Sequence, residues 1–94
     1  AFPKEEVRKV VAMAGVNERR VVDGGTCSTD LCYAAAESVL DALGWERESI
    51  DGLIMVTQTP DYFMPSSSCV LHKRLGLSDR CAAFDLGLGC SGYV

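Results

Sequence analysis

The chain has 94 residues, of which 48% are hydrophobic and 23% are charged, and its formal net charge is −4. This composition is typical of one small globular domain, or of a piece of a larger one, and it disfavours a disordered chain. The net negative charge and the lack of a long basic run disfavour a nucleic-acid partner. The sequence contains no run of about 18 apolar residues, so no membrane-spanning helix is predicted.

A first helix is predicted over about residues 3–14. Pro3 suits the first helical turn, and apolar residues then recur at the i, i+3, i+4, i+7 spacing of one helix face, at Val7, Val10, Val11 and Ala14. Gly15 is a typical helix end. Residues 15–27 are charged and glycine-rich, which predicts a loop that includes a short strand at 19–22.

Two further helices are predicted from apolar stripes. The first begins at a cap formed by Ser28 or Thr29 and ends at Gly44, and its stripe consists of Cys32, Ala35, Ala36, Val39, Leu40 and Leu43. The second begins at a cap formed by Ser66 or Ser67 and ends at Gly76, with Val70, Leu71 and Leu75 facing inward.

Two strands complete the pattern. Residues 53–56 are an unbroken apolar run, which predicts a strand buried on both faces, and residues 81–87 predict a second such strand. The order helix, strand, helix, strand predicts an α/β fold with a parallel sheet and right-handed crossovers. Ligands of such sheets bind at the carboxyl ends of the strands, which here are followed by loops 57–65 and 87–92. Because a third crossover helix would begin only after Gly92, we expect residues 1–94 to be part of a larger fold.

The stretch AFDLGLGCSGYV has three interpretations. Gly87, Gly89 and Gly92 match the G-x-G-x-x-G pattern of dinucleotide-binding turns, although that pattern normally opens a domain. Alternatively, a sharp strand-to-helix turn presents Cys90 as a nucleophile, with its amide in an oxyanion hole and a helix N-terminus stabilising the thiolate. The third interpretation is a structural cysteine in a tight turn.

A cysteine nucleophile needs a proton acceptor, and His72 is the only histidine. It lies beside Lys73 and Arg74 on the third predicted helix, where we expect it to face solvent or the helix edge and to be structural. The general base is therefore expected to come from outside these 94 residues.

The chain contains five cysteines, at positions 27, 32, 69, 81 and 90, and no C-x-x-C pair. A zinc site would need paired short spacings and more histidines, so no metal site is predicted. The odd number and the absence of a basic-then-apolar leader favour a reduced, cytoplasmic protein. In such a protein we expect Cys32, Cys69 and Cys81 to be buried hydrophobic residues.

Three segments together resemble the N-terminal part of a β-ketoacyl-acyl-carrier-protein synthase III, a member of the thiolase superfamily. They are GVNERRVV, STDLCYAAAESVLDALGWERESIDGLIMVTQTPDYFMPSS and LGLSDRCAAFDLGLGCSGYV, and FD…CSGY is the most specific motif. The resemblance implies a five-layer αβαβα fold built from two similar halves. Residues 1–94 would form most of the N-terminal half and end at the nucleophile turn.

The same resemblance implies an acyltransferase with no permanently bound cofactor. Cys90 would take an acyl group from a thioester such as acetyl-CoA and then condense it with malonyl-acyl-carrier protein, with loss of carbon dioxide. The Cys90 amide, within the turn shaped by Gly89 and Gly92, would supply one oxyanion-hole donor. The family's histidine and asparagine come from the second half, so these 94 residues alone are expected to be inactive.

The family is typically a homodimer, and Met64 matches a loop position whose side chain lines the partner's acyl pocket. The alternative for Met64 is local packing within its own loop. The adenine of CoA is often held by a Trp and an Arg, but Lys9 and Met13 occupy those places here. Arg19 and Arg20 could attract the CoA phosphates, or could be a solvated charge pair.

Two other hypotheses stay open on the sequence alone. One is a nucleotide-binding α/β domain that uses Gly87, Gly89 and Gly92. The other is a non-catalytic module that acts only in packing or dimerisation.

Overall fold

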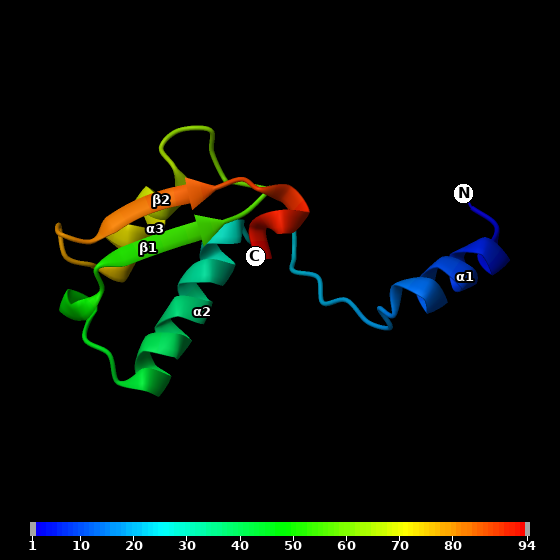
Figure 1. The fold of residues 1–94 in the computed structure, drawn as a ribbon, viewed down its shortest axis with the longest axis horizontal. Helices are drawn as coiled ribbons and strands as arrows, with labels where there is room; N and C mark the ends of the chain where they lie inside the picture. The colour runs from blue at the N-terminus through cyan, green and yellow to red at the C-terminus, as the bar shows by residue number, and fades with distance from the viewer. Residues whose placement is uncertain (1, 94) are drawn as a thin grey trace.

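The computed structural model describes residues 2–93. In chain order it contains helix α1 (Lys4–Ala14), helix α2 (Ser28–Leu43), the 3-10 helix η1 (Arg47–Ser49), strand β1 (Gly52–Val56), helix α3 (Ser67–Leu75), strand β2 (Ala82–Leu86) and the 3-10 helix η2 (Gly89–Tyr93). Strands β1 and β2 pair in parallel, with Gly52 opposite Ala82 and Val56 opposite Leu86. The predicted element order and the parallel pairing are confirmed. Figure 1 shows α2 and α3 beside this sheet, with α1 set apart at the end of an extended linker.

All three α-helices end where the sequence predicts. Gly15, Gly44 and Gly76 follow them with φ of 67°, 64° and 63°, the left-handed conformation that glycine adopts without a steric penalty. The strand predicted at 19–22 is wrong, because residues 16–23 have no regular structure. A strand needs a paired neighbour, and the described residues offer this segment none.

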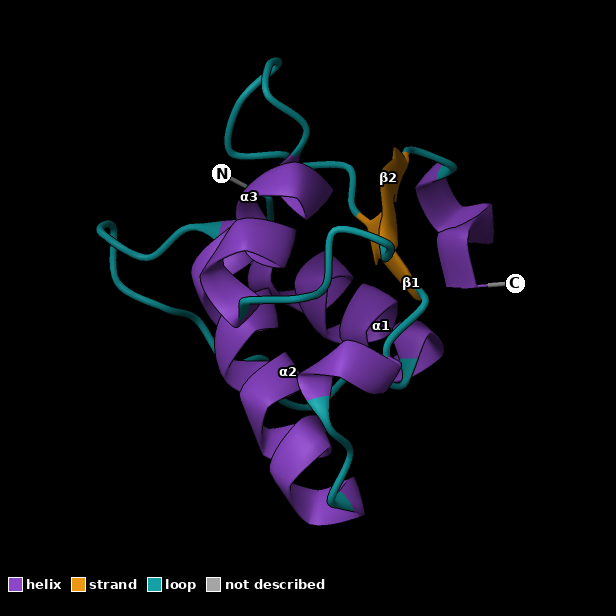
Figure 2. Ribbon diagram, turned by 90° about the vertical axis from the view of Figure 1, so that its left-hand side faces the viewer, coloured by secondary structure: helices purple, strands orange, loops and turns teal. Residues whose placement is uncertain are grey.

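The sheet is covered by α-helices on one face only. Met55, on the face toward α3, is 3% exposed, whereas its neighbour Ile54 on the opposite face is 54% exposed. Val56 and Phe84 are also exposed on that second face. The prediction of strands buried on both faces is therefore wrong for the described residues, because α2 and α3 both pack on the same side. Figure 2 shows the two helices on one side of the strands and η2 on the other.

The core lies between the sheet and the two helices that cover it. Its buried members are Leu71, Leu75, Leu77 and Cys81, with Cys32, Tyr33, Ala36, Ile50 and Leu53 packed against them. Burial of these side chains is the main source of stability of the unit. Of the apolar stripe predicted for α2, Cys32 and Ala36 join Leu71 and Leu75 of α3 in this cluster. Ala35, Val39 and Leu43 are exposed, so the prediction is wrong for that part of the stripe.

Two arginines join α2 and α3 at the edge of this core. Arg74 donates to Asp30 at 2.8 Å, and its guanidinium lies 4.7 Å from the centre of the Tyr33 ring. Arg47 donates to Glu37 at 2.6 Å and to the Leu75 carbonyl oxygen at 2.8 Å, which satisfies a carbonyl in the last turn of α3. These contacts fix how the two helices lie against each other more than they add to stability, because exposed ion pairs contribute little.

Helix α1 forms as predicted, but its apolar stripe is not buried. Val7, Val10 and Val11 are exposed, and so are Phe2 and Met13. Periodicity predicts which face of a helix is apolar, but burial depends on another surface that packs against it. Within the described residues, none of the helices is both long enough and apolar enough to cross a lipid bilayer.

Candidate active site

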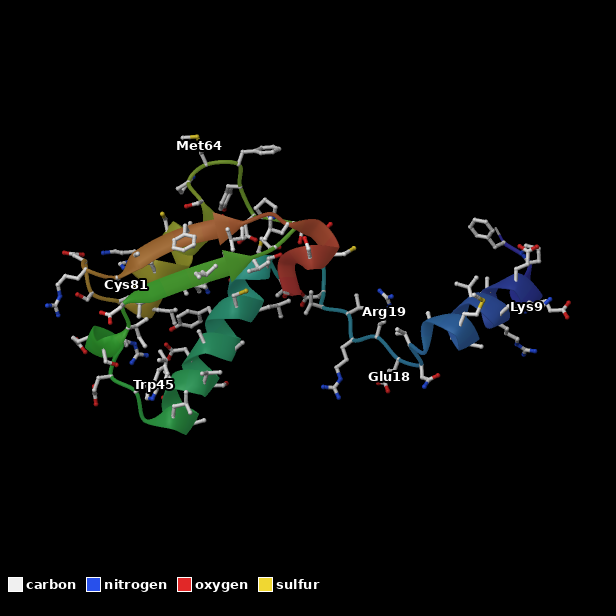
Figure 3. All side chains as sticks on the ribbon, viewed as in Figure 1. Lys9, Glu18, Arg19, Trp45, Met64 and Cys81 are labelled. Atoms are coloured by element: carbon white, nitrogen blue, oxygen red, sulfur yellow. The ribbon has the colours of Figure 1, made fainter. Side chains whose placement is uncertain are left out.

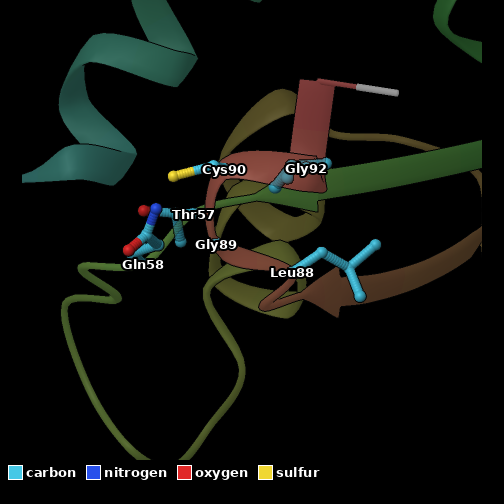
Figure 4. A pocket seen from close by; sticks show the side chains of 7 residues that line it. Thr57, Gln58, Leu88, Gly89, Cys90 and Gly92 are labelled. Carbon is cyan, nitrogen blue, oxygen red and sulfur yellow. The ribbon is translucent and has the colours of Figure 1, made fainter.

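A hollow of about 370 Å³ opens at the carboxyl ends of the two strands. Its lining comes from the end of β1, from the loop that follows it and from the turn after β2, and consists of Val56, Thr57, Gln58, Leu88, Gly89, Cys90 and Gly92. Figure 4 shows the Cys90 thiol projecting from the turn on the same side as Thr57 and Gln58. The sheet thus brings together the two loops that the parallel topology predicts as its functional edge.

The turn after β2 exposes Cys90 on a tightly bent backbone. Gly89 has φ of 58°, in the left-handed region that disfavours a side chain. The Ser91 amide and hydroxyl both donate to the Leu88 carbonyl oxygen, at 3.3 and 2.7 Å. Among the described residues, the Cys90 amide donates to no acceptor. An exposed thiol therefore lies beside an unused backbone donor, which is the arrangement that an oxyanion hole requires.

Most of this turn is itself the 3-10 helix η2, which contains Gly89, Cys90 and Gly92. Dinucleotide-binding turns place the pyrophosphate at the N-terminus of an α-helix. Of the residues after Gly92 the structure describes only Tyr93, so the nucleotide and nucleophile interpretations both stay open on the geometry of this turn.

Gly92 is the tightest position in the turn. A Cβ atom there would lie 2.6 Å from Cγ1 of Val56, closer than real contacts allow, whereas a Cβ on Gly87 would meet nothing within 4 Å. Val56 is β-branched and cannot easily rotate away. The absence of a side chain at Gly92 lets η2 lie against the exposed face of β1, and this contact sets the position of Cys90.

We therefore expect Gly92→Ala to lower the free energy of unfolding by about 1–3 kcal/mol, the usual cost of overpacking. Gly87→Ala, in the same turn, is the matched control and should change stability by less than about 1 kcal/mol. Urea unfolding of the two variants measures the difference. Equal stabilities would show that the turn adapts without cost and that Gly92 does not position Cys90.

The loop between β1 and α3 is anchored to the start of α2. Asp61 accepts hydrogen bonds from the Thr29 hydroxyl and, at 3.3 Å, from the Thr29 amide, so it satisfies a free donor of the first helical turn. Ser28 donates to the Thr59 carbonyl oxygen at 2.9 Å. The prediction that Ser28 or Thr29 forms the helix cap is wrong, because the N-cap residue is Cys27 and both hydroxyls bind the loop instead.

Asp85 has a similar role at the start of α3. Its carboxylate accepts the amides of Ser67 and Ser68 at 2.8 and 2.7 Å. Burial alone raises the pKa of Asp85, but the hydrogen bonds from Ser68 and Ser67 outweigh that effect and leave the pKa below its usual value. Ser66 occupies the N-cap position as predicted, yet its side chain makes no capping bond and donates to Cys69 Sγ at 3.0 Å.

Asp61 and Asp85 were not among the residues that the sequence singled out. The only signal for Asp85 is a charged residue inside an apolar strand, and charged residues are rarely buried without a partner. No local pattern marks Asp61, since its partner lies 32 positions away.

His72 lies at the opposite end of β2 from Cys90. Its Nε2 is 3.0 Å from the carbonyl oxygen of Ser78, which precedes β2, whereas Cys90 follows it. A strand of five residues separates the two ends by about 17 Å. The structural interpretation of His72 fits this geometry, and the described residues do not bring a histidine to the thiol.

The other cysteines divide between core and surface. Cys81 is buried, as expected, whereas Cys32 is only partly buried against the core. Burial raises the pKa of both thiols, and Asp51 adds to the effect at Cys81 and Asp61 at Cys32. The expectation that Cys69 is buried is wrong: it is exposed, because the face of α3 that carries it points away from the core. Cys27 and Cys90 are exposed as well. Among the described residues, no three metal-binding side chains lie close enough to hold an ion.

The structure does not bring every predicted site residue to the hollow. Met64 is 86% exposed at the tip of the loop between β1 and α3, next to the fully exposed Phe63, so it is not packed within its own loop. Arg19 and Arg20 are exposed on the linker before α2 and do not line the hollow. Figure 3 shows Met64 and Arg19 projecting from different parts of the chain.

Comparison with solved structures adds a second line of evidence. Over 98% of its length, the chain superposes on a 3-oxoacyl-(acyl-carrier protein) synthase from Burkholderia xenovorans LB400, with a TM-score of 0.88 and 50% sequence identity. It is also 38% identical, over 85 residues and 90% of its length, to the β-ketoacyl-[acyl-carrier-protein] synthase III of Thiobacillus denitrificans. The chain is homologous to part of the β-ketoacyl-acyl-carrier-protein synthase III proteins.

This synthase III relationship confirms the resemblance seen in the sequence and the thiolase-like α/β fold. A more distant match is OleA of Xanthomonas campestris, with a TM-score of 0.70 and 26% identity over 87% of the chain. No family model matches the chain. The chain spans about a quarter of each of these relatives, namely 26% of the Burkholderia protein and 27% of the other two.

Proposed function

We propose that these residues form the part of a β-ketoacyl-acyl-carrier-protein synthase that carries the acyl-accepting cysteine, Cys90. The observation that supports this most directly is an exposed thiol beside an unused backbone amide at the carboxyl ends of two parallel strands. The names of the related synthases support the proposal, because they describe enzymes that make a β-ketoacyl group on acyl-carrier protein.

In the proposed reaction, the Cys90 thiolate attacks the carbonyl carbon of an acyl thioester such as acetyl-CoA. The carbonyl oxygen becomes an oxyanion that the Cys90 amide stabilises, and collapse of the adduct releases the CoA thiol and leaves the acyl group on Sγ. Malonyl-acyl-carrier protein then loses carbon dioxide, and its α-carbon attacks the new thioester and frees the thiol. A histidine and an asparagine outside these 94 residues would assist the second step.

The remaining features of the proposal concern the whole protein. Residues 1–94 would be most of the N-terminal half of a cytoplasmic homodimer, inactive when isolated. The exposed tip of the loop, Phe63 and Met64, would reach the partner subunit, where Met64 lines the acyl pocket. Arg19 and Arg20 would meet the phosphates of CoA, in place of the adenine clamp that Lys9 and Met13 do not provide.

Intact-protein mass spectrometry tests the first step. The complete polypeptide that contains these residues is incubated with acetyl-CoA, and separately with acetyl-acyl-carrier protein. We expect one acyl group to be added, to map to Cys90, and to be lost on addition of malonyl-acyl-carrier protein. If neither donor acylates Cys90, or if the adduct maps to another cysteine, the proposed function is wrong.

A further inference from the structure

The hollow beside Cys90 has two chemically different sides. Val56 and Leu88 are apolar, whereas Thr57 and Gln58 carry a hydroxyl and a carboxamide. In Figure 4 the Gln58 side chain extends from the end of β1 toward the Cys90 thiol. A small molecule bound at the thiol would therefore have hydrocarbon on one side and hydrogen-bonding groups on the other.

The backbone on either side of Gln58 is fixed by hydrogen bonds. The Thr57 amide donates to the Leu86 carbonyl oxygen at 3.2 Å and extends the sheet by one residue. Thr57 Oγ1 accepts the Thr59 amide at 3.0 Å, and the Thr59 carbonyl oxygen accepts the Ser28 hydroxyl at 2.9 Å. These bonds tie the segment to β2 and α2, so the direction in which Gln58 leaves the chain is set by its anchored neighbours.

The carboxamide of Gln58 itself makes no hydrogen bond with the residues described. Its two N–H donors and its carbonyl oxygen are free to bind a ligand. The oxygen of a thioester carbonyl on Cys90 already has a donor in the Cys90 amide. Gln58 is therefore available for a second oxygen, farther along the acyl chain.

We propose that Gln58 is a specificity-determining residue that selects acyl groups carrying a hydroxyl or keto oxygen. This inference rests on the proposed function, since it requires that Cys90 accept an acyl group. The carboxamide donates a hydrogen bond to the substituent oxygen, while Val56 and Leu88 contact the carbon chain.

The test compares two thioesters with the same number of carbons, 3-hydroxybutyryl-CoA and butyryl-CoA. The initial rate at which each acylates Cys90 of the complete polypeptide is measured by intact mass. We expect the wild type to favour the hydroxylated group by about three- to tenfold, which corresponds to one hydrogen bond in a partly solvated site. Gln58→Leu removes the carboxamide, so the preference of this variant for the hydroxylated group should fall to a ratio of about one.

Asn17→Leu, which removes an exposed amide on the linker, is the control and should keep the wild-type ratio. A wild type without preference, or a Gln58→Leu variant with an unchanged ratio, overturns the inference while leaving Cys90 acylation and the proposed function intact. If no acyl group is transferred to wild-type Cys90 from CoA or from carrier protein, the proposed function fails and the inference fails with it.

Discussion

Cys90→Ala in the complete polypeptide is expected to abolish acyl-enzyme formation, whereas Cys69→Ala should leave it unchanged. Alanine offers no nucleophile, so the covalent step disappears and turnover should fall by about 10³-fold or more, as for other nucleophile deletions. Cys69 is the control, because its thiol is exposed like that of Cys90 but lies on α3, outside the hollow. Both side chains are exposed, so neither change should disturb the fold.

The measurement is the yield of acyl-protein in intact-mass spectra, with circular dichroism to verify folding. Alkylation by iodoacetamide provides a second comparison, since prior acylation should protect Cys90 and leave Cys69 reactive. An acyl adduct that persists in Cys90→Ala, or disappears in Cys69→Ala, would mean that the nucleophile has been assigned to the wrong cysteine.

Asp85→Ala is expected to lower the free energy of unfolding at pH 7 by about 2 kcal/mol. The substitution leaves the amides of Ser67 and Ser68 without an acceptor at the start of α3, and loss of a helix cap or of hydrogen bonds to a charged group costs about this much. Asp85→Asn retains one oxygen but no charge, so we expect a smaller loss. Asp79→Ala, an exposed aspartate in the turn before β2, is the control and should be nearly neutral.

The contribution of Asp85 depends on pH in a defined direction. Its pKa in the folded protein lies below the value of about 3.9 found in an unfolded chain. The unfolded state therefore binds a proton more readily, so the stabilisation is complete above about pH 4 and is lost as the pH falls toward the folded pKa. Urea unfolding at pH 7 and under acid conditions should show the wild type and Asp85→Asn converging in acid. If the difference in unfolding free energy between the wild type and Asp85→Asn grew as the pH fell, this account would be wrong.

The helices and strands could be predicted because their signals are local. Gly15, Gly44 and Gly76 end helices because the left-handed conformation needed there is accessible to glycine, whatever lies nearby. The apolar runs of β1 and β2, separated by a helix, predict parallel strands, because the connection between them is long enough for a crossover. Cys90 could be singled out for the same reason, since its glycine-flanked turn is encoded by adjacent residues.

What the sequence could not provide is which surfaces meet. The apolar stripe of α1 and the run Leu53–Val56 both suggest burial, yet Val10 and Ile54 are exposed, because burial requires a second surface that periodicity does not identify. Cys69 was expected to be in the core for the same reason, and the way α3 packs on the sheet places it outside.

By itself, then, the sequence determined the order of the elements, the helix ends, the parallel sheet, the synthase III relationship and the position of the cysteine turn. The tertiary structure alone decided that Asp61 and Asp85 complete the starts of α2 and α3, and that Gln58 and Cys90 line the same hollow. Asp85 and Asp61 are separated along the chain by between 17 and 32 positions from the residues that donate to them. Gln58 and Cys90 belong to different loops. Such distant groups meet only because the register of two strands and the packing of two helices bring them together.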